Sequence, residues 1–192
     1  MDATRPGPGL TMSDARVRPA VKADLPAVTA IYNEGIRGRT ATFETAERQV
    51  PDLATWLESS HPFLVAERAE DGGSAVVGWI RSAPYGPREC YAGVGDFSLY
   101  VTASARGRGV GRALMRAFLP ACAAAGLWKV IGRIFPENDA SRALCAQQGF
   151  REVGRYEKHA KLDGVWRDVV IVERWLASDA SPPAESPAEQ QA

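Results

Sequence analysis

The sequence predicts a mixed α/β domain of the α+β kind, with a mostly antiparallel sheet of about seven strands flanked by about four helices. Three observations predict this class. Segments with the apolar periodicity of strands alternate with segments that have helical periodicity. Turn-forming residues separate consecutive strands, which favours hairpins and antiparallel pairing. The 192 residues, 45% of them apolar, suffice for one domain with its own core.

The first half of the chain is expected to hold four strands and two helices. A helix begins at about Asp24, because Pro26 suits a first turn and apolar residues recur at helical spacing after it. Asp71-Gly72-Gly73 favours a hairpin turn. The expected segments are strands over Ala15–Val21, Phe63–Glu67, Ala75–Ser82 and Val94–Thr102, and helices from Asp24 (with the stripe Leu25, Val28, Ile31 and Tyr32) and over Pro51–Glu58.

The second half is expected to hold two helices and three strands, with parallel crossovers around the helices. Gly126 and Gly149 stand where helices end, and Asn138 is a favourable N-cap. Asp163-Gly164 favours another hairpin. The expected segments are helices over Val110–Ala125 and from Asn138 to about Gln148, and strands over Trp128–Ile134, Phe150–Leu162 and Val165–Leu176.

Composition divides the chain into one domain and two tails. Residues 1–14 and the acidic residues 177–192 are rich in Pro, Ser, Ala and Gly, so we expect disordered tails around a domain at 15–176. The chain carries 23 Lys and Arg against 23 Asp and Glu, and this neutrality argues against a nucleic-acid partner.

The location and metal content follow from what the sequence lacks. The three cysteines (Cys90, Cys122 and Cys145) form neither a disulfide framework nor a zinc pattern, which fits a reducing cytoplasm and predicts no metal. No apolar run approaches the roughly 20 residues of a membrane span. The N-terminal residues also lack the apolar core of a secretory signal. We therefore expect a cytoplasmic protein with no membrane partner.

A loop rich in glycine and arginine lies between the strand that ends at Thr102 and the helix that begins at Val110. Its backbone N–H groups and the helix N-terminus suit a phosphate. A dinucleotide-binding fold would need glycine where Arg112 stands, and the Gly-Lys-Ser/Thr of a P-loop is absent. The alternative is a flexible surface turn. The loop consists of Arg106, Gly107, Arg108, Gly109, Val110, Gly111 and Arg112.

The pattern Arg-x-x-Gly-x-Gly resembles the pyrophosphate loop of the GCN5-related N-acetyltransferase (GNAT) family. The segments Asn138–Leu144 and Gln148-Gly149-Phe150 resemble its second signature, and the likeness covers about 15–176. The resemblance implies a GNAT-like fold and acetyl-CoA as cosubstrate. It implies that the cofactor-binding residues are Leu99, Tyr100, Val101, Arg106, Gly107, Arg108, Gly109, Val110, Gly111, Arg112, Asn138 and Ser141.

Within that family, several segments resemble acetyltransferases of the phosphinothricin type and the branch that acetylates arsinothricin. They include Thr40–Phe43, His61–Glu67 and Trp166–Val169. The resemblance implies acetylation of the α-amine of a small anionic amino acid, with resistance to an antimetabolite as the outcome. Relatives that act on methionine sulfone or sulfoximine leave the substrate open. The resemblance also implies a homodimer formed through the C-terminal strands.

Asp96 is the candidate catalytic residue. An ammonium must lose a proton before it attacks a thioester, and the family assigns this task to a carboxylate, usually Glu, at the matching position. A carboxylate within an apolar strand is costly unless paired, and burial would raise its pKa. The alternative is a carboxylate that is paired with an arginine such as Arg81 or Arg88. Asp is one methylene shorter than Glu, which favours a water relay.

The remaining candidates concern the acceptor and the leaving group. By position, Arg88 matches the family's substrate arginine, and arginine suits carboxylate and other oxyanions. Other candidates for the acceptor site are Arg81, Tyr85, Phe43 and Thr42. Where the family has a Tyr or His as proton donor for the CoA thiolate, this chain has Cys145, so the alternatives are that the thiolate leaves unassisted or takes a proton from solvent or from Tyr156. His159 lies in a strand whose charged face is explained by solvation or by substrate contact.

Three functions remain in competition. The first is an N-acetyltransferase for a glutamate-like antimetabolite, and the second is a protein or polyamine acetyltransferase. The third is a non-catalytic CoA-binding module. The arginine-rich domain weighs against cationic polyamines, while Asp96 weighs against a module without catalysis.

Overall fold

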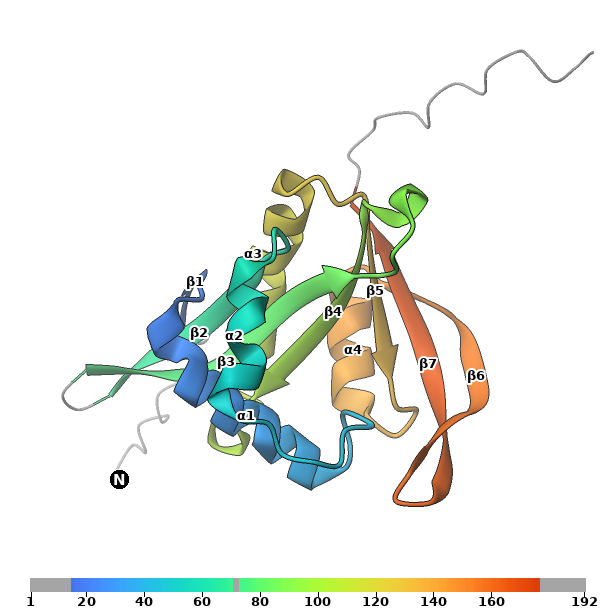
Figure 1. Ribbon diagram of the computed structural model, residues 1–192, viewed down its shortest axis with the longest axis horizontal. Coiled ribbons are helices and arrows are strands. Elements are labelled where there is room, and N and C mark those ends of the chain that lie inside the picture. Colours follow the sequence, from blue (N-terminus) through green and yellow to red (C-terminus); the bar gives the residue numbers. More distant parts are fainter. Residues whose placement is uncertain (1–14, 71–72, 177–192) are drawn as a thin grey trace, which may run out of the picture.

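The computed structural model describes residues 15–70 and 73–176, and within these residues seven strands form one sheet. The strand order is β1-β2-β3-β4-β5-β7-β6, with β4 and β5 parallel and each other pair antiparallel (Figure 1). The expected fold class is therefore confirmed. The strands are β1 (Arg16–Pro19), β2 (Phe63–Glu70), β3 (Gly73–Pro84), β4 (Val94–Val101), β5 (Lys129–Ile134), β6 (Arg151–Leu162) and β7 (Val165–Trp175).

Four α-helices cover the two faces of the sheet, with α1 and α2 on one face and α3 and α4 on the other (Figure 1). They are α1 (Leu25–Gly38), α2 (Val50–Ala54), α3 (Val110–Ala124) and α4 (Asp139–Gln147). Short 3-10 turns, which the sequence analysis did not predict, are η1 (Lys22–Asp24), η2 (Thr55–Glu58), η3 (Glu89–Tyr91) and η4 (Ala103–Ala105). The helix expected over Pro51–Glu58 is thus α2 followed by the tighter turn η2.

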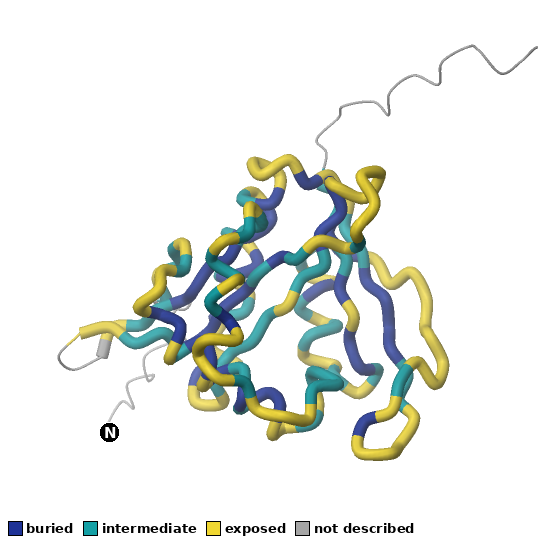
Figure 2. The backbone as a smooth tube through the Cα atoms, viewed as in Figure 1, coloured by how far each residue is buried: buried dark blue, intermediate teal, exposed yellow. Residues whose placement is uncertain are grey.

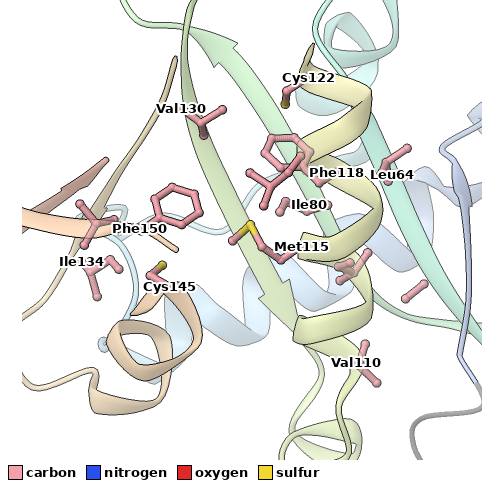
Figure 3. Close-up of a cluster of buried hydrophobic side chains, with 14 of the residues drawn as sticks. Leu64, Ile80, Val110, Met115, Phe118, Cys122, Val130, Ile134, Cys145 and Phe150 are labelled. Carbon is pink, nitrogen blue, oxygen red and sulfur yellow. The ribbon is translucent and has the colours of Figure 1, made fainter. Parts of the chain in front are cut away.

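Along β2 and β3, alternate residues pack into two different hydrophobic cores. Leu64 and Ile80 pack under α3 with Phe118, while Val65 and Trp79 pack against α1 and α2. Successive strand residues point to opposite faces, so this division follows from the sheet geometry. Figure 3 shows the α3 core, and Figure 2 shows that buried backbone follows the central strands while β6 is exposed along most of its length.

Most boundaries agree with expectation to within a few residues. The glycines expected to end helices have positive φ, +84° at Gly126 and +75° at Gly149, and Phe150 after the second of them is buried. Strands β2 and β3 extend beyond the predicted segments and pair as far as Glu70 and Gly73. Asp71 and Gly72 of the predicted turn, and both predicted tails, lie outside the described residues.

The α1 core is an aromatic cluster that reaches the end of β4. Tyr100 stacks on Trp79 with ring centroids 4.8 Å apart, and its edge meets Tyr32 at 5.0 Å. Tyr100 also donates a hydrogen bond to the Ala41 carbonyl at 3.2 Å. A Cβ on Gly35 of α1 would lie 2.6 Å from the Tyr100 ring, so glycine here lets the helix approach β4. This contact fixes the position of Tyr100.

Among the described residues, no helix has both the length and the apolar character that crossing a membrane requires. The longest helix, α3, has 15 residues and packs its apolar face in the core.

We expect Gly35→Ala to lower the free energy of unfolding by about 1–3 kcal/mol, although alanine is the better helix former. The added Cβ overlaps the Tyr100 ring. Gly38→Ala in the same helix is the control, because its Cβ meets only Thr40 Oγ1 at 3.8 Å. Urea unfolding of both variants measures the difference. Equal stability of Gly35→Ala and the parent protein would contradict the packing argument.

Candidate active site

The site is built on a fork between β4 and β5. These parallel strands pair only at Val94 with Lys129, Gly95 with Val130 and Asp96 with Ile131. Beyond Asp96, β4 continues to pair with β3 through Phe97–Val101, but β5 has turned away. The backbone groups on that edge of β4 are therefore available to a ligand.

A cavity of about 460 Å³, here called the cofactor cleft, lies between this free edge, α1, α4 and the glycine loop. Eleven of the twelve predicted cofactor-binding residues line it, and Arg108 is not among the lining residues. The eleven are Leu99, Tyr100, Val101, Arg106, Gly107, Gly109, Val110, Gly111, Arg112, Asn138 and Ser141. Segments distant in the sequence therefore meet at one cleft.

The glycine loop has the geometry that a phosphate needs. Gly107 and Gly109 have φ of +70° and +81°, a conformation that favours glycine. Gly109 is the N-cap of α3, where no side chain caps the helix and no acid lies in the first turn. The first N–H groups of α3 and the positive end of its dipole thus face the cleft. A pyrophosphate fits this set of donors.

Glu34 of α1 organises the approach to the loop, and the sequence analysis missed it. Its carboxylate accepts hydrogen bonds from Thr102 Oγ1 at 2.9 Å and Ala103 N at 2.7 Å. It also pairs with Arg106 at 3.3 Å. Arg106 is held further by its hydrogen bond to the Val101 carbonyl at 3.0 Å. A lone glutamate on a helix gives no sequence signal of these contacts.

Asn138 begins α4 and lines the cofactor cleft as well. Its side chain accepts a hydrogen bond from Ser141 N at 3.1 Å, which confirms the predicted N-cap. Its amide also donates to the Thr40 carbonyl at 3.3 Å. The same residue thereby positions both α4 and the segment that follows α1.

A second cavity of about 610 Å³, here called the acceptor cavity, lies on the α1 face of the fork. Three of the residues predicted for catalysis or for the acceptor line it: Asp96, Thr42 and Phe43. A cavity of about 70 Å³ lies between it and the cofactor cleft, and Ala41 and Tyr100 line all three. A donor in the cleft and an acceptor beside Asp96 would therefore meet at the fork.

Asp96 is mostly buried, with its side chain 15% exposed, and it forms an ion pair with Arg133 of β5. The alternative stated from the sequence, an ion pair with an arginine such as Arg81 or Arg88, is confirmed in the kind of partner, but the arginine is Arg133. The parallel register explains the difference. Asp96 pairs with Ile131, so Arg133, two residues further, is on the same face of the sheet.

Three residues predicted for the acceptor site lie outside the acceptor cavity as the structure describes it. Arg81 is directed onto the Trp56 ring, 4.2 Å from its centroid, and burial lowers its pKa. Arg88 is the N-cap of η3 in the exposed connection before β4. Tyr85 is 46% exposed and packs on Tyr91 at 5.3 Å. Their roles remain predictions. His159, by contrast, lines the cavity.

Cys145 is the residue at the position where the sequence resemblance implies a proton donor for the departing thiolate. It is buried in the α3 core beside Phe150 and also lines the small cavity (Figure 3). Burial raises the pKa of its thiol to about 12. A free thiol has a pKa of about 8.5, so proton transfer from Cys145 to a thiolate would be unfavourable. Cys145 is therefore a packing residue.

A cleft for a pyrophosphate-bearing donor beside a carboxylate-lined cavity is the arrangement of an acyltransferase. A model of the Acetyltransferase (GNAT) family matches residues 28–150. The chain therefore belongs to the GNAT family, and it is an N-acetyltransferase whose acetyl donor is acetyl-CoA.

Three relatives illustrate the likeness. A phosphinothricin N-acetyltransferase from Streptomyces coelicolor is 32% identical over 85% of this chain and 98% of its own. An L-methionine sulfoximine/L-methionine sulfone acetyltransferase from Pseudomonas aeruginosa is 29% identical over 88% and 99%. The crystal structure of a phosphinothricin acetyltransferase from Sinorhizobium meliloti in complex with acetyl-CoA has a TM-score of 0.80 and 30% identity, covering 90% and 95%.

We expect Gly109→Val to weaken acetyl-CoA binding by at least about tenfold. Valine resists the positive φ at this position, and its side chain would displace the backbone from the phosphates. Gly126→Val at the other end of α3 is the control, because its φ of +84° imposes the same strain away from the cleft. Calorimetric titration measures both affinities. The expectation fails if both variants bind acetyl-CoA as the parent does.

Proposed function

We propose that this enzyme acetylates the α-amine of a small anionic amino acid such as phosphinothricin or arsinothricin, and so confers resistance to it. The observation that carries the proposal is the position of Asp96. Asp96 lies at the last paired residue of the fork and lines the acceptor cavity, while β4 beyond it lines the cofactor cleft. The phosphinothricin acetyltransferases among the relatives support this choice of acceptor.

Asp96 acts as the general base. It takes a proton from the acceptor ammonium, directly or through a water molecule, so that a neutral nitrogen remains. That nitrogen forms the bond to the acetyl carbon, the bond from carbon to sulfur breaks, and the nitrogen releases its second proton to solvent, so that a neutral amide and a thiolate result. Free backbone groups of Leu99–Val101 hold the pantetheine arm, and the loop around Gly109 holds the pyrophosphate. Solvent protonates the departing thiolate, because the buried thiol of Cys145 is too weak an acid.

A second acceptor class is favoured by one comparison. A relative of similar identity is named for methionine sulfoximine and methionine sulfone. In these compounds a polar sulfur group replaces the anionic side-chain group. The walls of the acceptor cavity, among them Thr42, Phe43 and His159, include both polar and aromatic groups. This class therefore belongs in the same test.

The test is acetyl transfer from acetyl-CoA to phosphinothricin, arsinothricin, methionine sulfone and methionine sulfoximine, with a polyamine for comparison. We expect kcat/KM to be at least about 10²-fold higher for one of the amino acids than for the polyamine. Tight acetyl-CoA binding without turnover of any amine would favour a non-catalytic module. Faster turnover of the polyamine would favour the competing enzyme class.

We further propose a cytoplasmic homodimer that pairs through β6 and β7. The three cysteines are free thiols, which fits a reducing compartment. Strand β6 is at the edge of the sheet, and the apolar side chains of Val153, Tyr156 and Trp166 are about half exposed on the hairpin. Sedimentation velocity tests the proposed homodimer, and a monomer at all concentrations would refute it.

We expect Asp96→Asn to lower kcat/KM by about 10²- to 10⁴-fold and to abolish the acidic limb of its pH profile, because the amide cannot accept the proton. Acetyl-CoA affinity should be unchanged. Asp163→Asn is the control, since it breaks the exposed ion pair with Arg39 without altering the acceptor cavity. A pH–rate profile that is the same in Asp96→Asn and the parent would remove Asp96 as the base.

A further inference from the structure

Arg133 has a position that the assigned roles do not explain. Fifteen of the described residues line the acceptor cavity, and Arg133 is the one Lys or Arg among them. It also lines the small cavity that leads toward the cofactor cleft. Strand β5 thus brings the Arg133 guanidinium to the point where the two substrates would meet. The other residues of this strand are Lys129, Val130, Ile131, Gly132 and Ile134.

The ion pair with Asp96 leaves the guanidinium available. The Arg133 side chain is 53% exposed, whereas that of Asp96 is 15% exposed. The other carboxylate of the acceptor cavity, Glu44, pairs with Arg48 at 2.7 Å. Among the carboxylates that line this cavity, Arg133 therefore forms an ion pair with Asp96 alone. Its outer face is free to receive a second anion.

An amino acid carries an ammonium and a carboxylate on the same carbon, and the pair of Asp96 and Arg133 has the complementary charges side by side. We propose that Arg133 binds the α-carboxylate of the acceptor amino acid while Asp96 faces its amino group. This inference rests on the proposed function and deepens it. The ion pair of the free enzyme is replaced by two ion pairs with the substrate, so neither charge is left without a partner.

The exchange of partners gives a rule for specificity. The ammonium of an amine without a carboxylate would pair with Asp96. The Arg133 guanidinium would then have no anionic partner and would lie beside the positive charge of the ammonium, which is unfavourable in a partly buried site. A carboxylic acid without an amine would pair with Arg133 and leave the Asp96 carboxylate without a cationic partner. Arg133 therefore selects α-amino acids over simple amines and polyamines. Its role is to bind and orient the acceptor, while the proton transfer belongs to Asp96.

The experiment compares an amino acid with its α-carboxamide. The probe is whichever of the four amino acids the parent enzyme acetylates best. We expect the parent to prefer the acid over the carboxamide by at least about 10²-fold in kcat/KM. Arg133→Met should remove most of that preference, by raising KM for the acid with little change for the carboxamide. Arg133→Lys should restore part of it, because lysine keeps the charge but lacks the planar fork.

Arg37→Met is the matched control. Arg37 is 57% exposed and pairs with Glu47 at 2.9 Å, so the same change breaks a comparable ion pair outside the three cavities. It should leave the preference for the acid unchanged. Thermal unfolding and acetyl-CoA affinity show whether each variant is folded. If Arg133→Met does not fold, Arg133→Gln removes the charge with a side chain that, like arginine, is polar.

The outcomes separate the two proposals. A parent enzyme that acetylates the amino acids, with Arg133→Met lowering the rates on acid and carboxamide equally, would overturn the role of Arg133 and leave the proposed function standing. A higher rate in Arg133→Met would likewise overturn it, because Arg133 would then only restrain Asp96. A parent enzyme that acetylates amines without a carboxylate but none of the amino acids would overturn both.

Discussion

The short parallel contact between β4 and β5 is the constraint on which the site depends. Three residue pairs hold the two strands together, and the chain then separates them. If the pairing continued, the backbone groups of Leu99–Val101 would be satisfied within the sheet, and no cleft would exist. Since the pairing ends at Asp96, the last paired residue also lines the acceptor cavity. The fork therefore determines both the cofactor cleft and the position of the proposed base, Asp96.

Tyr100 connects this fork to the stability of the domain. Its ring belongs to the aromatic cluster between the sheet and α1, and the same residue lines all three cavities. Gly35 provides the space that the ring occupies, and Ala41 accepts the hydrogen bond from its hydroxyl. A change in helix packing at Gly35 would therefore move a wall of the site. Stability and geometry at this position are not separable.

Local features of the sequence were sufficient to predict the fold and the cofactor cleft, but not the acceptor cavity. Helix caps, strand alternation and the glycine loop are encoded by neighbouring residues, as Asn138 and Gly109 show. The partner of Asp96 depends on which residues of two distant strands align, so Arg133 could not be identified from spacing. The role of Arg88 remains a prediction, since spacing does not reveal the direction in which an exposed connection leads.

The neutral net charge conceals how the arginines are distributed. In the C-terminal half, most arginines are neutralised locally, as in the pairs of Arg142 with Glu152, Arg155 with Asp168 and Arg167 with Glu137. Between residues 99 and 127 the sequence contains four arginines and no acid. Across the described residues, no ion pair includes Arg108, Arg112 or Arg116, while Arg106 is shared with Glu34. The surplus of positive charge therefore surrounds the phosphate loop, whereas the acceptor cavity has a balanced pair. This contrast suits a polyanionic donor and a zwitterionic acceptor, and it explains why charge counts alone identify only the first of them.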